Sequence, residues 1–318
     1  MYLYLQNSVL GYTQTELETY FADYLQPCAA AQEISREQLL RKIQQWYNGY
    51  SWNGKDRVYN PFSISNLFAN NEFDNYWFAS GTPTFLINLI KQTQTDITQF
   101  DRKRVPKILF DSYELDKIDV LALLFQTGYL TITDAYRDDG IEYVLNYPNR
   151  EVKDAFLTYL FESFTDNRRN DVQIAANQLR RCLRQEDVAG FLNIMRALFA
   201  KIPYSLHLPE EAYYHSLFYM IAALLGVEID LEVLTDKGRI DGVLEFGEAV
   251  YIIEFKHGKA GSDLTDLTDK AIRQIQTKKY AERFRHDARK RILLGIGFAG
   301  KEIGYQRSAS TAGTGRGH

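Results

Sequence analysis

The chain has 318 residues, a formal net charge of −4 at pH 7, 45% hydrophobic residues and 14% aromatic residues. This length is enough for two domains, and the apolar content can bury a core. The acidic balance argues against tight nonspecific binding to nucleic acid, because proteins that bind in that way usually carry a basic surface. No apolar run reaches the length of a membrane span, the longest covering residues 217–225. Cys28 and Cys182 lie far apart without metal-type spacing, so we expect reduced thiols and a cytoplasmic protein.

The N-terminal part of the chain is predicted to be mostly helical. Thr13 with Glu16, and Ser35 with Gln38, match the capping box, in which two side chains satisfy each other's backbone donors at a helix start. Apolar periodicity and stop signals supply the remaining helix boundaries. The predicted helices cover residues 14–26, 36–47, 151–165, 170–184 and 187–200.

Residues 119–147 are predicted to form a small winged-helix-like element. A short helix over 121–125 precedes two short strands, at 129–133 and 143–145, with a turn at Asp138-Asp139-Gly140 between them. Because this turn is acidic, it is poorly suited to touching DNA. We therefore expect a packing or linker role for the element.

The C-terminal part is predicted to follow a linker that contains Pro203 and Pro209. A helix over residues 210–225 has an apolar stripe at helical spacing, and a strand over 227–234 comes next. This helix and strand lead directly into the segment that carries the most informative residues.

A β-hairpin is predicted over residues 238–256. A two-residue turn at 247–248, with Gly first as a type II′ turn requires, predicts how its two strands pair. Counting outward from this turn, Asp241 lies directly opposite Glu254. Side chains alternate along a strand and opposed residues share a face, so Lys256 joins the two acids on one patch.

This patch has the chemistry of a metal site. Two converging carboxylates suit a hard cation that prefers oxygen ligands, such as Mg²⁺ or Mn²⁺. A lysine beside them can orient a water molecule or offset charge at a phosphoryl centre. Further candidates nearby are Glu211 and His215, four residues apart on the preceding helix, and Glu232 on the preceding strand.

Beyond the hairpin, a helix is predicted over about residues 266–284 and a buried strand over 292–298. Gln276 and Tyr280 are four residues apart, so they are expected to share a face of that helix. The predicted order of elements is therefore helix, three strands, helix, strand.

The hairpin contains Gly-Arg-Ile-Asp-Gly-Val followed by Tyr-Ile-Ile-Glu-Phe-Lys. This pattern resembles the metal motif of the PD-(D/E)XK nuclease superfamily, although Ile240 stands where that motif has Pro. The resemblance implies an αβββαβ domain that hydrolyses phosphodiester bonds in DNA with Mg²⁺ or Mn²⁺. It also implies that Asp241 and Glu254 hold the metal with the Phe255 carbonyl as a third ligand, and that Lys256 positions or activates the attacking water.

Two further elements of the superfamily have counterparts here. Gln276 and Tyr280 resemble the Gln-x-x-x-Tyr element of its exonuclease branch, which implies that they steer the nucleic-acid strand. Glu211 or His215 would correspond to a metal ligand that some members carry on the preceding helix.

The front of the chain resembles part of a different domain. Tyr-Asn-Gly-Tyr at 47–50, Tyr-Asn-Pro-Phe-Ser at 59–63 and Gln-Thr-Gly-Tyr-Leu at 126–130 are similar to the lid-side part of a predicted AAA-type ATPase domain, which precedes such nuclease domains in bacterial proteins. An ATPase of this class needs Gly-x-x-x-x-Gly-Lys-Ser/Thr. Every Gly-Lys pair here is followed by Asp, Ala or Glu, so we expect no ATPase activity and consider a separate ATPase subunit as a partner.

The sequence thus predicts an α+β protein. Residues 1–203 would form a helical module with the winged-helix-like element, residues 204–305 the αβββαβ nuclease-like domain, and residues 306–318 a disordered tail poor in apolar side chains. The favoured function is a Mg²⁺-dependent nuclease. The alternative is a catalytically silent remnant or regulatory partner that binds a separate ATPase or nucleic acid without cleaving it.

Overall fold

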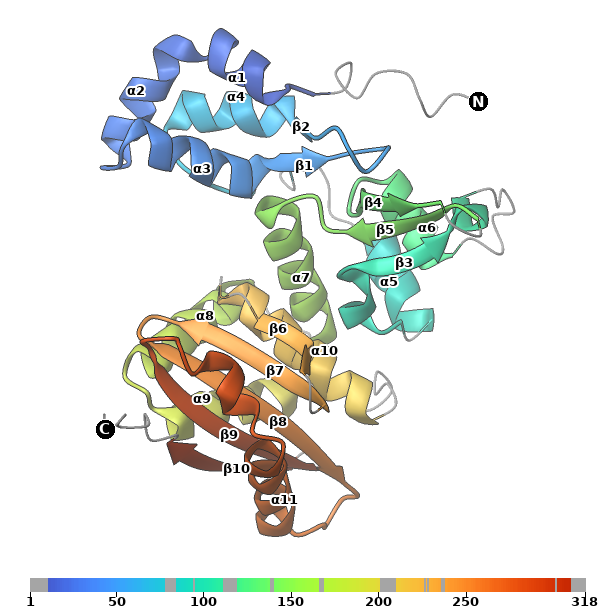
Figure 1. Ribbon diagram of the computed structural model, residues 1–318, viewed down its shortest axis with the longest axis vertical. Helices are drawn as coiled ribbons and strands as arrows, with labels where there is room; N and C mark the ends of the chain where they lie inside the picture. The colour runs from blue at the N-terminus through green and yellow to red at the C-terminus, as the bar shows by residue number, and fades with distance from the viewer. Residues whose placement is uncertain are drawn as a thin grey trace, which may run out of the picture. The chain divides into compact units, whose positions relative to one another are not determined.

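The structure is a computed structural model, shown in Figure 1. It describes residues 11–77, 84–93, 95–110, 119–137, 140–165, 169–200, 210–225, 227, 229–235, 238–300 and 302–309. The chain forms two compact units, Met1–Tyr159 and Leu160–His318. Across the described ranges, no helix has the length and apolar character needed to cross a membrane.

The first unit is mainly helical and contains two small sheets. Its elements are α1 (Gln14–Tyr20), α2 (Ala22–Ala31), α3 (Arg36–Tyr47), β1 (Asn48–Tyr50), β2 (Val58–Tyr59), α4 (Pro61–Asn70), α5 (Thr84–Thr93), the 3-10 helix η3 (Ile97–Phe100), β3 (Lys103–Pro106), η4 (Lys107–Phe110), α6 (Val120–Gln126), β4 (Thr131–Tyr136), β5 (Glu142–Asn146) and the start of α7 (Arg150–Thr165).

Both predicted capping boxes are confirmed. The Thr13 hydroxyl accepts from the Glu16 backbone N–H, and the Glu16 carboxylate accepts from the Thr13 backbone N–H at 2.8 Å. Ser35 and Gln38 make the equivalent pair of bonds at the start of α3. These bonds satisfy donors that a helix leaves unpaired at its first turn, so the local sequence sets both helix starts.

The predicted helix over residues 14–26 is instead two helices, α1 and α2, that meet at Phe21. The backbone of Phe21 leaves helical geometry, with φ −109° and ψ 20°. Its ring stacks on Phe68 of α4, with the ring centroids 4.8 Å apart. The helix therefore breaks at a residue whose side chain packs against a helix distant in the sequence. Helical propensity alone would have continued the helix through this residue.

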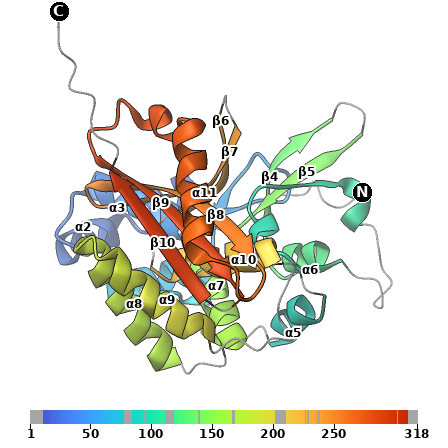
Figure 2. The same cartoon turned by 90° about the horizontal axis from the view of Figure 1, so that it is seen from below.

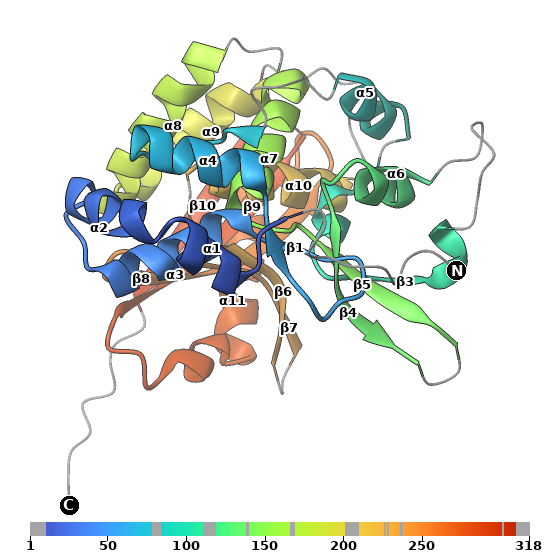
Figure 3. The same ribbon diagram turned by 90° about the horizontal axis from the view of Figure 1, so that it is seen from above.

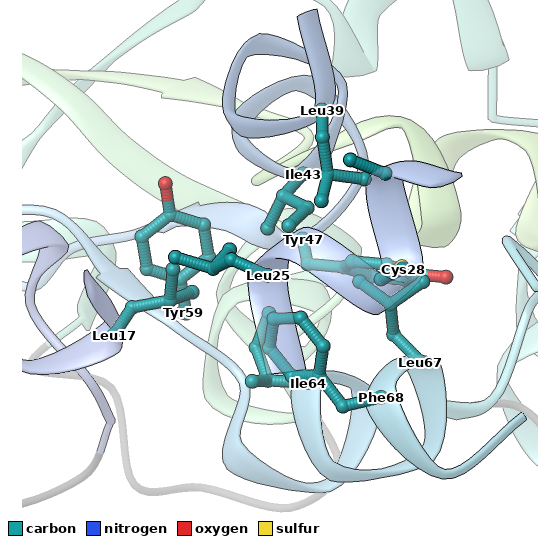
Figure 4. Close-up of a cluster of buried hydrophobic side chains, with 11 residues drawn as sticks. Leu17, Leu25, Cys28, Leu39, Ile43, Tyr47, Tyr59, Ile64, Leu67 and Phe68 are labelled. Atoms are coloured by element: carbon teal, nitrogen blue, oxygen red, sulfur yellow. The ribbon is translucent and has the colours of Figure 1, made fainter. Parts of the chain in front are cut away.

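The helices α1 to α4 surround one apolar core, shown in Figure 4. Tyr47 and Tyr59, which come from the two aromatic sequence motifs, lie fully buried within it. The Tyr47 hydroxyl donates to the Asp74 carbonyl at 3.0 Å, and the Tyr59 hydroxyl donates to the Gln14 side chain. Burying these large rings with their hydroxyls paired explains why the motifs are rich in tyrosine.

The predicted wing is confirmed as the antiparallel hairpin β4–β5, which is visible in Figure 3. A third strand that was not predicted, β3, pairs with β5, so the sheet order is β3-β5-β4. Ser51 ties the end of β1 to β4 through two hydrogen bonds with the Thr131 hydroxyl. Gly49 lies so close to Pro148 that a Cβ atom would sit 1.8 Å from its carbonyl oxygen, and only glycine fits there.

The second unit is built on a five-stranded sheet in the order β10-β9-β8-β7-β6, in which only β8 and β9 are parallel among the described strands. The predicted order helix, three strands, helix, strand is confirmed, with one further strand after it. The elements are α8 (Arg169–Arg184), α9 (Val188–Ala200), α10 (Glu210–Leu224), β6 (Ile229–Thr235), β7 (Gly238–Phe246), β8 (Ala249–Gly258), α11 (Leu264–Thr277), the 3-10 helix η7 (Tyr280–Phe284), β9 (Lys290–Ala299) and β10 (Glu302–Ala309).

Helices cover both faces of this sheet. On one face, Ile272 and Ile275 of α11 pack on Ile252 of β8, as the position of α11 over the strands in Figure 2 illustrates. On the other face, Phe255 of β8 contacts Phe218 of α10 with the ring centroids 5.2 Å apart. The strand β8 is therefore buried on both sides, which explains its nearly unbroken apolar sequence.

The division of the chain differs from the predicted boundary at residue 203. Helices α8 and α9 belong to the second unit, since Arg180 of α8 donates to the carbonyls of Leu224 and Leu225 at 2.8 and 2.9 Å, and the Phe199 ring of α9 lies near Phe298. The predicted linker lies outside the described residues. The local sequence can indicate a linker, whereas the domain that a helix packs against depends on residues distant in the sequence.

The predicted tail over residues 306–318 begins too early. Strand β10 pairs with β9 in one continuous antiparallel register from Glu302↔Ala299 to Ala309↔Ile292. The backbone N–H and C=O groups along this side of β9 pair with those of β10. This pairing orders a segment that has little apolar character of its own. Residues 310–318 lie outside the described residues.

Helix α11 approaches the sheet closely over two glycines of β9. A Cβ atom at Gly295 would lie 2.8 Å from the Thr268 carbonyl oxygen, and one at Gly297 would lie 2.9 Å from the Leu267 Cβ. In the parallel register, Gly295 pairs with Glu254 and Gly297 with Lys256. Because these two residues of β9 are glycines, the helix can pack closely over the part of the sheet that carries the predicted site.

We predict that Gly295→Ala destabilises the second unit by roughly 1–3 kcal/mol, the usual cost of adding a methyl group to a packed interface. Gly304→Ala is the matched control, because its added Cβ would meet only the side chain of Leu264, at 3.0–3.5 Å. Hydrogen exchange of the β8 and β9 amides measures the effect on this unit alone. Equal protection in the two variants would mean that the close approach of α11 does not constrain the sheet.

Candidate metal centre

The site is built on the β7–β8 hairpin, whose predicted register is confirmed. Strand pairing runs from Phe246↔Ala249 to Gly242↔Ile253, on either side of a two-residue turn. Gly247 has a φ of +54°, and Glu248 is not among the residues with positive φ, as a type II′ turn requires. The recorded ladder ends at Gly242↔Ile253, and the same register continued by one step places Asp241 opposite Glu254.

Asp241 is held by the backbone of the neighbouring strand. Its Oδ2 atom accepts the backbone N–H of Phe255 at 2.8 Å. This bond turns the carboxylate across the hairpin toward β8, where Glu254 lies. Burial is the largest cause of the raised pKa of Glu254, and the nearby charge of Asp241 is the next. The two carboxyl groups thus meet, as the register predicts.

Glu254 is a buried acid, with 1% of its side chain exposed. Its Oε1 atom accepts the Lys256 ammonium at 2.7 Å, whereas its Oε2 atom is buried and has no hydrogen-bond partner among the described residues. Burial is the largest of the effects that raise the pKa of Glu254 to about 7, the charge of Asp241 is the second, and Lys256 acts in the opposite direction. A buried carboxylate with an unsatisfied oxygen beside a second acid favours a cation as its neighbour.

Lys256 lies at the solvent side of the acids, with 29% of its side chain exposed. Besides Glu254, its ammonium contacts the carbonyl oxygen of Phe255 at 3.2 Å. The two oxygens that it contacts are among the predicted metal ligands. A metal held by those oxygens would therefore compete with the ammonium, leaving Lys256 free to donate hydrogen bonds to a neighbouring group.

The donor set fits a hard divalent cation. Mg²⁺ sites commonly use one or two carboxylates and complete their shell with water and substrate phosphates, so Asp241, Glu254 and the Phe255 carbonyl are sufficient. Within the described part of the chain, no three His, Cys, Asp or Glu side chains form a further metal-type group. The predicted ligand Glu211, and the alternatives His215 and Glu232, have side chains outside the described residues.

The expectation that Gln276 and Tyr280 share one helix face is wrong. Helix α11 ends at Thr277, Lys279 takes a left-handed conformation with φ +52°, and Tyr280 begins the 3-10 helix η7. Gln276 is exposed, whereas Tyr280 is buried.

The position of Tyr280 indicates what it contributes to the site. Its hydroxyl donates to the Arg239 carbonyl at 2.7 Å, two residues before Asp241. Its ring belongs to the apolar cluster between α11 and the sheet. This contact anchors the start of β7 and so helps to place Asp241. The role of Gln276 in steering a strand stays a prediction.

Sequence analysis did not include Gly295 and Gly297 among the site residues. They lie beside Glu254 and Lys256 in the parallel register and admit α11, which helps to desolvate the acids. A signal was present, because glycines spaced two apart within an apolar strand indicate a close approach of backbone or ligand.

The fold and the hairpin together define an α/β core of the nuclease type, with an acid, a second acid and a lysine meeting on its central hairpin. Residues 209–307 match the model of the PD-(D/E)XK nuclease superfamily, so this part of the chain is similar to that superfamily. The predicted resemblance is therefore confirmed for the C-terminal domain. The match does not extend to the predicted ATPase-like part.

One curated relative matches most of the chain. It is described as an uncharacterized protein in the vnfD 5′ region of Azotobacter chroococcum mcd 1, and it is 34% identical over 306 residues. The match covers 92% of this chain and 55% of that protein, so the chain spans about half the length of the relative. No solved structure gives a significant match.

We predict that Glu254 makes the metal-free protein less stable as pH rises from about 4.5 to about 7. A carboxyl whose pKa is raised by folding binds its proton more tightly when folded, so its stabilising effect is complete below the lower value and lost above the higher one. Glu254→Gln should remove this loss and be more stable by roughly 3 kcal/mol above the upper value, at about 1.36 kcal/mol per pKa unit over the shift from 4.5 to about 7. Thermal unfolding across this pH range measures the difference.

The matched control is Glu151→Gln in the first unit. Glu151 is also fully buried with a pKa raised to about 7, mainly by burial, and it accepts bonds from Ser63 and Trp77. Adding Mn²⁺ should reduce or reverse the advantage of Glu254→Gln and leave that of Glu151→Gln unchanged. The same Mn²⁺ response in both variants would argue against a metal at Glu254.

Proposed function

We propose that the second unit is a nuclease that hydrolyses phosphodiester bonds in DNA and depends on Mg²⁺ or Mn²⁺. The observation that carries the proposal is the meeting of Asp241 and Glu254 across the hairpin with Lys256 beside them. The match of residues 209–307 to the model of the PD-(D/E)XK nuclease superfamily supports the same reaction class.

Each residue has a distinct role in the proposal. Asp241 and Glu254 hold the metal with the Phe255 carbonyl, and the bond from the Phe255 N–H keeps the Asp241 carboxylate in place. A bound divalent cation would supply Lewis-acid stabilisation of charge on the phosphoryl oxygens. Tyr280 is a positioning residue, because it acts on Asp241 through the backbone of Arg239.

Lys256 is proposed to act on the nucleophile. Hydrolysis forms a bond between a water oxygen and phosphorus, breaks the bond from phosphorus to the leaving oxygen, and places negative charge on the phosphoryl oxygens. An ammonium that is partly exposed but held beside two acids can hydrogen-bond the water or these oxygens. The fixed position of its strand keeps that geometry before the substrate arrives.

The competing possibility is a protein that binds nucleic acid or a separate ATPase without cleaving. The two functions differ in a measurable way, because binding alone does not require Lys256. Metal binding and DNA cleavage by variants of the site distinguish the two functions.

We predict that Mn²⁺ or Mg²⁺ raises the thermal stability of the wild type and not that of Asp241→Asn. The amide oxygen of Asn can still accept the Phe255 N–H, so the substitution removes charge while it preserves the hairpin contact. The stabilisation follows the ratio of metal concentration to Kd, reaching about 2.7 kcal/mol at 100 times Kd. Weak binding is expected, because substrate oxygens are absent.

Glu245→Gln is the control for the metal titration. It lies on the same strand, is exposed, pairs with Arg289 and changes the net charge by the same amount. It should respond to Mn²⁺ as the wild type does. Equal shifts in Asp241→Asn and the wild type would remove Asp241 from the metal site.

We predict that Lys256→Ala lowers the rate of DNA cleavage by on the order of 10²-fold or more, the usual effect of removing one preorganised electrostatic group. DNA binding should be largely retained. Lys259→Ala, an exposed lysine shortly after it, makes the same charge change and should cleave at the wild-type rate. A wild type that cleaves neither single- nor double-stranded DNA with either metal would favour the non-catalytic alternative.

A further inference from the structure

The first unit contains a polar cleft away from any residue discussed so far as catalytic. It lies between the β1–β2 connection and the β3-β5-β4 sheet, and its volume is about 740 Å³. Three arginines line it, Arg57, Arg102 and Arg104, together with Tyr136 and one acid, Asp134. We call this feature the arginine cleft. Its lining side chains carry a net charge of +2, from three arginines and one aspartate, in a chain whose overall charge is −4.

Arg104 is held in a fixed orientation. Its guanidinium lies 3.9 Å from the centroid of the Tyr136 ring and makes an ion pair with Glu142 at 3.3 Å. Stacking and the ion pair together restrict a side chain that would otherwise sample many rotamers. A planar guanidinium fixed in this way is suited to bidentate contact with a phosphate group.

Arg57 and Arg102 remain available to a ligand. Neither makes an ion pair with an acid of the described residues, and both are exposed. The backbone of Arg102 has a φ of +55°, a left-handed conformation that a non-glycine residue adopts at a cost. Such strain is often found at ligand-binding positions. Four other non-glycine residues of the described ranges share this conformation, so the position of Arg102 in the cleft, rather than its backbone, carries the argument.

The donors that the cleft offers to a ligand come from its arginines. The hydroxyl of Tyr147, whose side chain lines the cleft and is only 5% exposed, is itself buried and is not offered to a ligand in the cleft. The three arginines supply the hydrogen-bond donors and positive charge to whatever enters the cleft, which favours a polyanion.

We propose that the arginine cleft binds the phosphodiester backbone of a nucleic-acid strand. The choice of ligand rests on the proposed function, since a nuclease needs to hold its substrate. A small phosphate ligand is usually enclosed on most of its surface, whereas these arginines are exposed and come from separate segments, which suits an extended strand. The acidic turn at residues 138–139, which made DNA contact through the wing unfavourable, lies outside the described residues.

The test compares two double variants of the full chain. Arg57→Gln/Arg102→Gln removes the two unpaired arginines. Arg36→Gln/Arg41→Gln removes two exposed arginines of α3 in the same unit, whose ion pairs are with Glu18 and Glu37, and it makes the same change of net charge. Binding of a labelled single strand and of its duplex is followed by fluorescence anisotropy in EDTA at several salt concentrations, so that the probe is not cleaved.

Loss of two phosphate contacts should weaken binding about equally for all sequences and reduce the slope of log K against log salt by ~1 per arginine, or ~2 for the pair. The control variant should keep the wild-type slope. Arg102→Gly should also weaken binding while it preserves or raises thermal stability, because glycine relieves the left-handed strain. A merely structural arginine would instead lose stability on that substitution.

The proposal is overturned if the two double variants bind alike, or if the wild type binds neither strand nor duplex. It is also overturned if ATP or pyrophosphate binds the cleft and a nucleic-acid strand does not compete, since the site would then take a small phosphate. Cleavage is assayed separately with Mn²⁺. Arginine-dependent binding without any cleavage would support the cleft and refute the nuclease. Cleavage with arginine-independent binding would do the reverse.

Discussion

The pairing of β7 with β8 brings two carboxyl groups together, one almost fully buried and the other partly exposed, and the character of the second unit depends on this contact. Glu254 is 1% exposed, and Asp241 is turned toward it by a bond from the backbone of β8. The mutual repulsion and the lost hydration are only partly offset by Lys256. A slip of one residue in the register would send the two acids to opposite faces of the sheet and abolish the site.

The surrounding packing holds the two carboxyl groups in this unfavourable contact. Gly295 and Gly297 admit α11 close to the strands beside the acids, and Tyr280 anchors β7 two residues before Asp241. In such a poorly hydrated environment, charges interact more strongly than they do in water. Under the proposed function, the same feature that destabilises the free acids would increase the affinity for a cation and the influence of the lysine charge on a reacting group.

The first unit shows how a net charge can conceal local chemistry. The chain is acidic overall, yet the arginine cleft gathers positive side chains from two separate segments of the sequence. The aromatic motifs that resemble part of an ATPase domain contribute Tyr47 and Tyr59 to the apolar core of the first unit. The paired acids of the second unit and the arginine cleft of the first unit would serve different steps of nucleic-acid handling under the proposals made above.

Sequence alone determined the features that depend on neighbouring residues. The capping boxes at Thr13 and Ser35, the turn at Gly247, and the register that opposes Asp241 to Glu254 all follow from local backbone geometry and an alternation of side chains. Only the tertiary structure decided that α8 and α9 cover the nuclease-type sheet, that β10 extends to Ala309, that α11 ends at Thr277, and that Arg57, Arg102 and Arg104 share a cleft. These outcomes depend on contacts between segments that are distant in the sequence. Such contacts leave no periodic pattern in the sequence from which they could be predicted.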